Sequence, residues 1–213
     1  MNSRTLSTLR GLYLLTPDEP DTQRLVARVA DVIAEGAVLL QYRNKAAGAA
    51  LQRRQAQALL PLCDAHGVGL VINDDWRLAA DMGAAGVHLG ETDGELAEAR
   101  RVLGHDALIG ASCYNRLELA VAAQSAGASY VAFGAFFDSG TKPMARRAPL
   151  ALLGQARALG LPTVAIGGIT PDNAHILLAA GADLLAVLGA VFDAANPAAA
   201  ARALVSCFDT DPQ

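Results

Sequence analysis

Short runs of β-branched or leucine-rich residues alternate along the chain with longer stretches rich in alanine and leucine. Several of the short runs are almost continuously apolar, which is typical of strands buried on both faces in a parallel sheet. The pattern predicts eight strands, at Gly11–Leu15, Val38–Tyr42, Gly69–Asn73, Gly86–Leu89, Ala107–Ser112, Tyr130–Gly134, Thr163–Gly167 and Leu184–Leu188.

The stretches between these strands carry apolar residues at helical spacing. Pro171 and Pro197 suit first helical turns, and each follows a residue that can cap a helix, Thr170 or Asn196. A short helix is expected after Asn73. The longer predicted helices are Thr22–Glu35, Ala49–His66, Glu95–Leu103, Arg116–Ala126, Leu150–Leu159, Pro171–Ala180 and Pro197–Cys207.

Eight strand–helix units within 213 residues predict an α/β fold, a (β/α)8 TIM barrel. The main alternative is a doubly wound open sheet, which more often has about five or six strands. No linker or low-complexity segment interrupts the pattern, so residues 1–213 are expected to form a single domain. The tail, from about residue 209 to 213, is expected to fray.

Composition narrows the possible partners. Charged residues make up 18% of the chain and the net charge is −4, with no basic stretch of the kind that binds nucleic acid. The three cysteines have no CxxC spacing, which favours reduced thiols in a cytoplasmic protein. No apolar run approaches the roughly 18 residues that span a bilayer, so a membrane partner is not expected.

Barrel enzymes place their active sites at the carboxyl ends of the strands, so the residues that follow each strand are candidate site residues. Gln41, Arg43 and Lys45 alternate at the end of the second strand and therefore project to one face. An amide and two cations on one face favour an anion-binding site. The alternative is a solvated strand end with ordinary surface charges.

Carboxylates follow the third and fourth strands. Asp74 comes directly after Asn73, and Asp93 lies in the next strand's loop. Carboxylates from two neighbouring loops can ligate Mg²⁺, which takes oxygen ligands and keeps waters and substrate phosphates as the rest. Alternatively, either aspartate caps the helix that follows it. His88, inside the fourth strand, is interpreted as a core histidine with satisfied hydrogen bonds.

Small polar residues and glycines follow the later strands. Ser112 ends the fifth strand, and the loop after the sixth contains Thr141 and Lys142, which suit phosphate oxygens but also fit a flexible surface loop. Gly168 and Gly189 follow the seventh and eighth strands, where backbone N–H groups can approach a phosphate closely. The strand ends therefore favour a diphosphate site with cations and a metal, and a second site for a single phosphate.

Six segments together resemble the thiamine phosphate synthase family, and the resemblance runs from about Gly11 to the last helix. The segments are LLQYRNK, INDDWRLAADMGAAGVHLGETD, IGASCYN, YVAFGAFFDSGTKP, VAIGGIT and AVLGAVF. The resemblance implies a (β/α)8 barrel that joins 4-amino-2-methyl-5-hydroxymethylpyrimidine diphosphate to 4-methyl-5-(2-hydroxyethyl)thiazole phosphate. The implied products are thiamine phosphate and diphosphate.

The resemblance also implies roles for individual residues. Mg²⁺ is expected on Asp74 and Asp93. Arg43, Ser112 and Lys142 are the expected catalytic residues, because they hold the diphosphate as it leaves. The implied substrate contacts are Gln41, Arg43, Lys45, Asn73, Ser112 and Lys142 for the pyrimidine diphosphate, and Thr141, Gly168, Leu188 and Gly189 for the thiazole phosphate.

The chain departs from the commoner family pattern at three positions. Asp138 stands where proline is usual, Glu91 where glutamine is usual, and Gly189 where serine is frequent. One alternative is a thiazole tautomerase-like isomerase of the same fold, whose catalytic histidine would fall at about Ala135. Another is a phosphate-metabolite binding protein with a decayed site. The partners expected are small molecules only, and self-association is left open.

Overall fold

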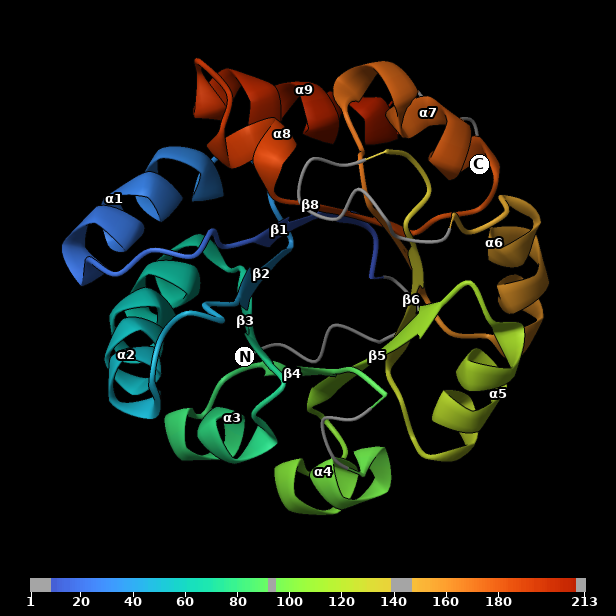
Figure 1. Ribbon diagram of the computed structural model, residues 1–213, viewed down its shortest axis with the longest axis horizontal. Helices are drawn as coiled ribbons and strands as arrows, with labels where there is room; N and C mark the ends of the chain where they lie inside the picture. Colours follow the sequence, from blue (N-terminus) through green and yellow to red (C-terminus); the bar gives the residue numbers. More distant parts are fainter. Residues whose placement is uncertain (1–8, 92–94, 139–146, 210–213) are drawn as a thin grey trace.

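Eight parallel strands form a closed barrel in the computed structural model, which describes residues 9–91, 95–138 and 147–209. Figure 1 looks down the barrel, with the helices in a ring outside it. The strands are β1 (Gly11–Leu15), β2 (Leu39–Tyr42), β3 (Gly69–Asn73), β4 (Gly86–Leu89), β5 (Leu108–Tyr114), β6 (Tyr130–Gly134), β7 (Thr163–Ile166) and β8 (Leu184–Val187). Because β8 also pairs with β1, with Gly11 opposite Leu184, the predicted barrel is confirmed and the open sheet is excluded.

The helices follow the strands in the order that the sequence predicts. They are α1 (Thr22–Ile33), α2 (Ala49–His66), α3 (Trp76–Met82), α4 (Leu96–Leu103), α5 (Leu117–Ser125), α6 (Ala151–Ala156), α7 (Pro171–Ala179), α8 (Gly189–Phe192) and α9 (Pro197–Asp209), with a 3₁₀ turn, η2 (Arg157–Leu159), after α6. Asn196 caps α9 by accepting a hydrogen bond of 3.0 Å from the Ala199 N–H group. At the start of α7, the Thr170 N–H group donates to Asn173 Oδ1 at 2.9 Å.

Several boundaries differ from the predicted ones by one or two residues, and one helix was not predicted. Strand β5 continues beyond Ser112 to Tyr114, because its register against β6 shifts between these residues and Tyr114 takes a left-handed φ of 54°. Helix α8 was not predicted, since four residues are too few to show helical periodicity. Helix α9 continues to Asp209, where fraying was expected to begin.

Two separate apolar cores hold the barrel. On β1, Leu12 and Leu14 point outward into the large core between strands and helices. Tyr13 and Leu15 alternate with them and point into a smaller core inside the barrel, which also contains Tyr130. Burying one such large side chain stabilises a fold by about 1.5–3 kcal/mol. The inner core closes the barrel and forms the floor beneath its carboxyl end.

The cysteines are free, as expected. Cys63 and Cys113 are buried, and burial raises the pKa of each thiol to about 12. Within the three described ranges, no helix combines the length and apolar character needed to cross a membrane.

Candidate active site

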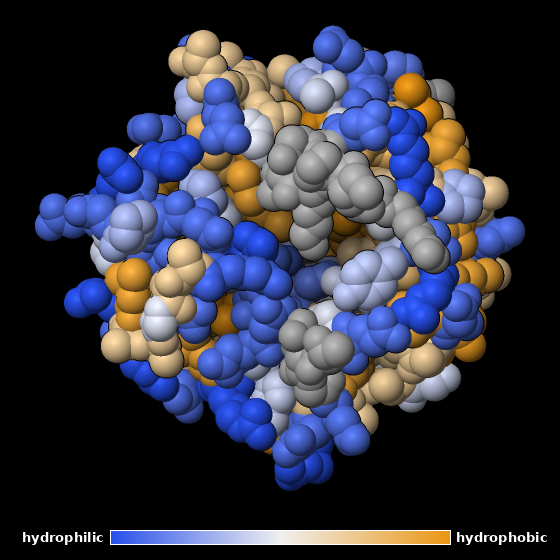
Figure 2. All heavy atoms as spheres, in the orientation of Figure 1, coloured by the Kyte–Doolittle hydropathy of each residue, from blue (hydrophilic) through white to orange (hydrophobic). Residues whose placement is uncertain are grey.

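A cavity of about 780 Å³ opens at the carboxyl end of the strands, above the inner core. Figure 2 shows hydrophilic side chains around the central hollow of this face, on the side of β2 and β3. Every predicted site residue that the structure describes lies on this cavity. These residues are Gln41, Arg43, Lys45, Asn73, Asp74, Ser112, Gly168, Leu188 and Gly189. The remaining three, Asp93, Thr141 and Lys142, lie outside the described residues.

The backbone after β2 is fixed to the loop that follows β1. Thr16 Oγ1 accepts from the Arg43 N–H group and donates to the Arg43 carbonyl, with both distances 2.9 Å. Asp18 Oδ1 accepts from the Lys45 N–H group at 3.0 Å and lies 3.5 Å from Arg43 Nη1. The Arg43 and Lys45 side chains therefore extend from a backbone that is held in place. The Arg43 side chain is only 19% exposed.

Asn44 lies between the two cations in the sequence, and its side chain points away from the cavity. Its Nδ2 donates to the Glu19 carbonyl at 2.8 Å and to Gln55 Oε1 at 3.0 Å, and the side chain is buried. The Glu19 carboxylate accepts from Arg24 Nε at 2.6 Å, which lowers its pKa. The predicted alternation is thus observed: Arg43 and Lys45 line the cavity, while the residue between them anchors the loop.

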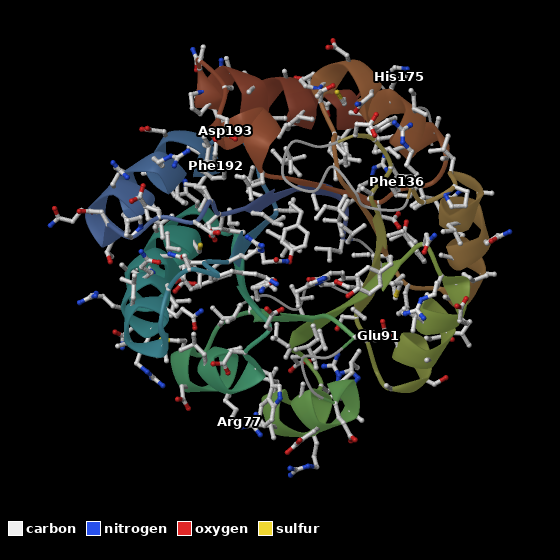
Figure 3. The ribbon with its side chains drawn as sticks, in the orientation of Figure 1. Arg77, Glu91, Phe136, His175, Phe192 and Asp193 are labelled. Carbon is white, nitrogen blue, oxygen red and sulfur yellow. The ribbon has the colours of Figure 1, made fainter. Side chains whose placement is uncertain are left out.

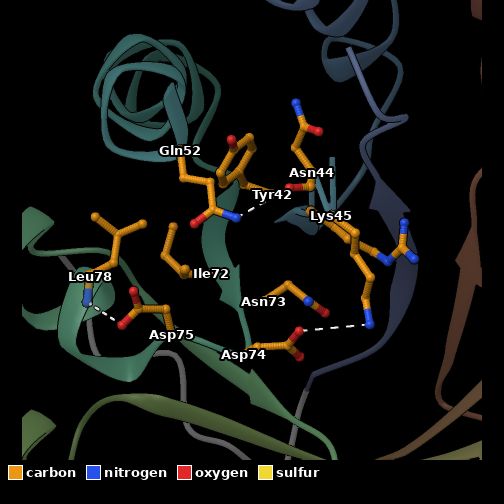
Figure 4. A pocket seen from close by; sticks show the side chains of 10 residues that line it. Tyr42, Asn44, Lys45, Gln52, Ile72, Asn73, Asp74, Asp75 and Leu78 are labelled. Carbon is orange, nitrogen blue, oxygen red and sulfur yellow. Dashed lines mark hydrogen bonds and ion pairs between the residues drawn. The ribbon is translucent and has the colours of Figure 1, made fainter. Parts of the chain in front are cut away.

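The two aspartates after β3 have different tasks. Asp75 Oδ1 accepts from the Leu78 N–H group at 2.9 Å and so caps α3. Asp74 has a left-handed φ of 65°, which is uncommon outside glycine, and its Oδ2 lies 3.8 Å from Lys45 Nζ (Figure 4). The helix-capping alternative therefore applies to Asp75 and not to Asp74. A side pocket of about 260 Å³ beside Asn73 adjoins this pair.

His88 is more than the core residue that the sequence suggested. It lines the cavity, with Nε2 2.9 Å from Ser112 Oγ and Nδ1 3.2 Å from the Tyr130 hydroxyl. Its position in the strand could have revealed this, because His88 pairs in register with Asn73, whose side chain shares the inward face. Sequence reasoning also missed Tyr114, which is 44% exposed at the rim.

Two of the three residues that depart from the family pattern, Glu91 and Asp138, form ion pairs. Glu91 Oε2 lies 2.7 Å from Arg116 Nη2, and this hydrogen bond raises the pKa of Arg116, so the extra negative charge is balanced. Asp138 forms an ion pair with Arg147. Figure 3 labels Glu91 at the end of β4, near the barrel mouth.

Glycines allow the backbone of the β7 and β8 ends to lie against the cavity. Gly168 has a φ of 66°, and a Cβ there would lie 2.3 Å from the Asp138 carbonyl oxygen. At the third departure, Gly189, a Cβ would lie 3.0 Å from a carboxylate oxygen of Asp193, which directly follows α8 and is labelled in Figure 3. A serine at Gly189 would therefore meet this carboxylate.

Comparison with known proteins places the chain among its relatives. The sequence model of the thiamine monophosphate synthase family matches residues 12–191. Thiamine-phosphate synthase from Xanthomonas campestris pv. campestris is 57% identical over 93% of this chain and 96% of its own length. The enzyme of that name from Chromobacterium violaceum is 56% identical over 94% of this chain and 97% of its own length.

Solved structures agree with these relatives. Thiamine phosphate pyrophosphorylase from Pyrococcus furiosus superposes with a TM-score of 0.85 at 30% identity, covering 98% of this chain and 100% of that one. KGPDC from Streptococcus mutans has a TM-score of 0.73 at 15% identity, covering 96% of this chain and 100% of that one, and shows the shared fold alone. The isomerase alternative finds no support among the curated relatives, which carry synthase names.

Proposed function

The chain belongs to the thiamine monophosphate synthase family, and we propose that its cavity joins the aminopyrimidine diphosphate to the thiazole phosphate named above. It is a transferase of thiamine biosynthesis with thiamine-phosphate synthase activity, acting on small molecules. The observation that carries the site assignment is convergence: all the described candidate residues, from five strand ends, line one cavity.

The diphosphate binds on the β2 side of the cavity in this proposal. Arg43 and Lys45 supply two positive charges on a fixed backbone, and Ser112 adds a hydroxyl from β5. Because Arg43 is mostly shielded from water, its attraction for an anion is screened less than that of an exposed arginine. Lys142 is assigned to the same group, although it lies outside the described residues.

The donors near Asp74 suit Mg²⁺. Asp74 offers a carboxylate that does not cap a helix, and Asn73 offers an amide oxygen beside it. No group of three His, Cys, Asp or Glu side chains within the described ranges could hold a metal, so substrate oxygens, waters and Asp93 would complete the coordination. When bound, Mg²⁺ would neutralise charge on the departing diphosphate.

The reaction is proposed to be dissociative. The aminopyrimidine releases electrons toward its exocyclic methylene, so the carbon–oxygen bond to diphosphate breaks before the new bond forms. Arg43, Lys45 and Ser112 hold the leaving group at the moment its charge develops. The thiazole nitrogen then attacks the methylene carbon, to which it is already close. This scheme requires no side-chain nucleophile.

The thiazole phosphate is assigned to the β7–β8 side. Gly168 and the backbone of Leu188–Gly189 line the cavity there, and a glycine leaves room for an anion to approach N–H groups. The Asp193 carboxylate also lines this part. Because a phosphate would be repelled by that carboxylate, we assign the stronger contacts to Gly168.

We propose the cytoplasm as the setting, supported by three free cysteines in a family that acts on small molecules. The test of function is direct. Purified protein is incubated with both substrates and Mg²⁺, and thiamine phosphate and diphosphate are measured. Formation of both in equal amounts is expected, and no product in the presence of both substrates would refute the proposal.

Arg43→Ala tests the assignment of the diphosphate site. The variant should lose turnover by about 100-fold, since one preorganised charge is removed from the leaving group. Arg53→Ala is the matched control, because Arg53 forms an exposed ion pair of 2.6 Å with Asp81 and lines neither pocket. Equal losses in the two variants would remove Arg43 from the site.

A further inference from the structure

Five side chains form one line of hydrogen bonds across the inside of the barrel. Gln41 Nε2 donates to the Tyr13 hydroxyl at 2.8 Å, and the Tyr13 and Tyr130 hydroxyls lie 2.9 Å apart. Tyr130 is 3.2 Å from His88 Nδ1, and His88 Nε2 is 2.9 Å from Ser112 Oγ. The line therefore joins two predicted substrate contacts, on β2 and β5, through three residues that have no assigned role.

Only one direction gives every hydrogen within the line an acceptor. An amide nitrogen donates and does not accept, so the Tyr13 hydroxyl accepts from Gln41 and its single hydrogen goes to Tyr130. Tyr130 then donates to His88 Nδ1, which leaves the imidazole hydrogen on Nε2. In the opposite direction, the Tyr13 hydrogen would face the amide hydrogens of Gln41.

This direction decides what the two ends offer to a ligand. His88 Nε2–H donates to Ser112 Oγ, so the serine hydroxyl keeps its own hydrogen for donation into the cavity. At the other end, the bond from Nε2 to Tyr13 fixes the orientation of the Gln41 amide, whose oxygen is the acceptor that Gln41 offers, while the second Nε2 hydrogen remains a donor. The cavity thus has a fixed acceptor at one end of the line and a fixed donor at the other.

We propose that Tyr13, Tyr130 and His88 are positioning residues that hold Ser112 as a hydrogen-bond donor to the leaving diphosphate and Gln41 as an acceptor for the pyrimidine amino group. The inference rests on the proposed function for the identity of the ligand. An acceptor at the amino group favours electron release from the ring, while a donor at the diphosphate stabilises the charge that departs. Both ends of the line therefore favour bond cleavage.

The surroundings of the two tyrosines suit a fixed line. Both are fully buried, and burial raises the pKa of each hydroxyl, so they stay protonated and orient hydrogens without carrying charge. Gly110 on β5 makes room for the Tyr130 ring, because a Cβ at that glycine would lie 2.1 Å from a ring carbon. The His88 ring stacks on the Tyr130 ring, with centroids 5.7 Å apart, which limits its rotation.

The first measurement is the tautomer of His88 in protein labelled with ¹⁵N-histidine, without substrates. The His88 signals are assigned by their loss in His88→Gln. The wild type should carry its hydrogen on Nε2. In Tyr130→Phe and in Tyr13→Phe the Nδ1–H form should appear, because Nδ1 loses a donor in the first variant and Tyr130 becomes free to accept in the second. An unchanged tautomer in both variants would overturn the proposal.

The second measurement is a double-mutant cycle on kcat. Tyr130→Phe should lower kcat about tenfold, the size of one lost hydrogen bond, with KM for the thiazole phosphate unchanged. In a Ser112→Ala background the same substitution should lower kcat less than about twofold, because Tyr130 acts through Ser112. A tenfold loss in both backgrounds would mean that Tyr130 does not act through Ser112, and would also overturn the proposal.

Tyr42→Phe is the matched control. It also removes a buried tyrosine hydroxyl with a hydrogen bond of 2.8 Å, donated to Gln55 outside the line. It should lower the melting temperature as Tyr130→Phe does, with the His88 tautomer unchanged. If Tyr130→Phe does not fold, Tyr13→Phe serves in both measurements. The tautomer needs no substrate, so an inactive wild type refutes the proposed function while this measurement still decides the proposed line.

Discussion

Asp74→Asn separates the metal site from the fold, because Asp74 and its neighbour Asp75 have different tasks. Asparagine keeps the shape of the side chain and tolerates the left-handed φ of 65°, so the backbone should not change. The substitution weakens the ion pair with Lys45, whose atoms are 3.8 Å apart with side chains 57% and 36% exposed. Exposed pairs of this kind contribute about 0–1 kcal/mol.

Asp75→Ala is the matched variant. It removes the cap of α3, a hydrogen bond of 2.9 Å to the Leu78 N–H group, which costs about 1 kcal/mol. In a chain of this size, that corresponds to a melting temperature lowered by about 2–4 °C. The two variants should therefore have similar stability. Their turnover should differ, because loss of a metal ligand removes several kcal/mol of transition-state stabilisation, at least about 100-fold in rate.

The assay is initial-rate formation of thiamine phosphate over a range of Mg²⁺ concentrations, with melting temperatures measured in parallel. Asp74→Asn should need a higher Mg²⁺ concentration for half-maximal rate, and Asp75→Ala should keep the wild-type dependence. Equal Mg²⁺ dependence in Asp74→Asn and wild type would refute the role of Asp74 in metal binding. Equal loss of turnover in both variants would indicate that Asp74 has a structural role and does not bind the metal.

Three further predictions concern other parts of the chain. Gly168→Ala should lower the free energy of unfolding by about 1–3 kcal/mol and raise KM for the thiazole phosphate, because its Cβ would lie 2.3 Å from a backbone oxygen at a φ of 66°; unchanged denaturant midpoints would contradict this. Glu91→Gln should leave kcat within about threefold, since Arg116 already balances Glu91 at 2.7 Å; a tenfold gain would show that Glu91 opposes the diphosphate. Burial raises the pKa of Cys63 and Cys113 to about 12, so both stay as thiols at pH 8 and should resist iodoacetamide. Alkylation of either cysteine in the native protein, detected by peptide mass spectrometry, would contradict this.

Much of the site could be predicted because side chains alternate in direction along a strand, which is a local property. Gln41, Arg43 and Lys45 were expected on one face from their spacing alone, and they line one cavity. The glycines after β7 and β8 were recognised from their place after these strands, where glycine lets the backbone approach a phosphate. Where the sequence offered alternatives, this alternation was not enough: Asp74 could ligate a metal or cap the helix that follows it, and only the geometry assigned that cap to Asp75.

The sequence by itself determined the strand–helix repeat, the barrel and the residues at each strand end, because hydrophobic periodicity and turn residues act over a few positions. Only the tertiary structure determined which side chains meet across the barrel. Tyr13 and Tyr130 are 117 positions apart and hydrogen-bond at 2.9 Å. His88 reaches Ser112, and Glu91 reaches Arg116, in the same non-local way. The contact between Tyr13 and Tyr130 depends on closure of the sheet, and the other two depend on the pairing of β4 with β5. Both bring together residues that local spacing cannot relate.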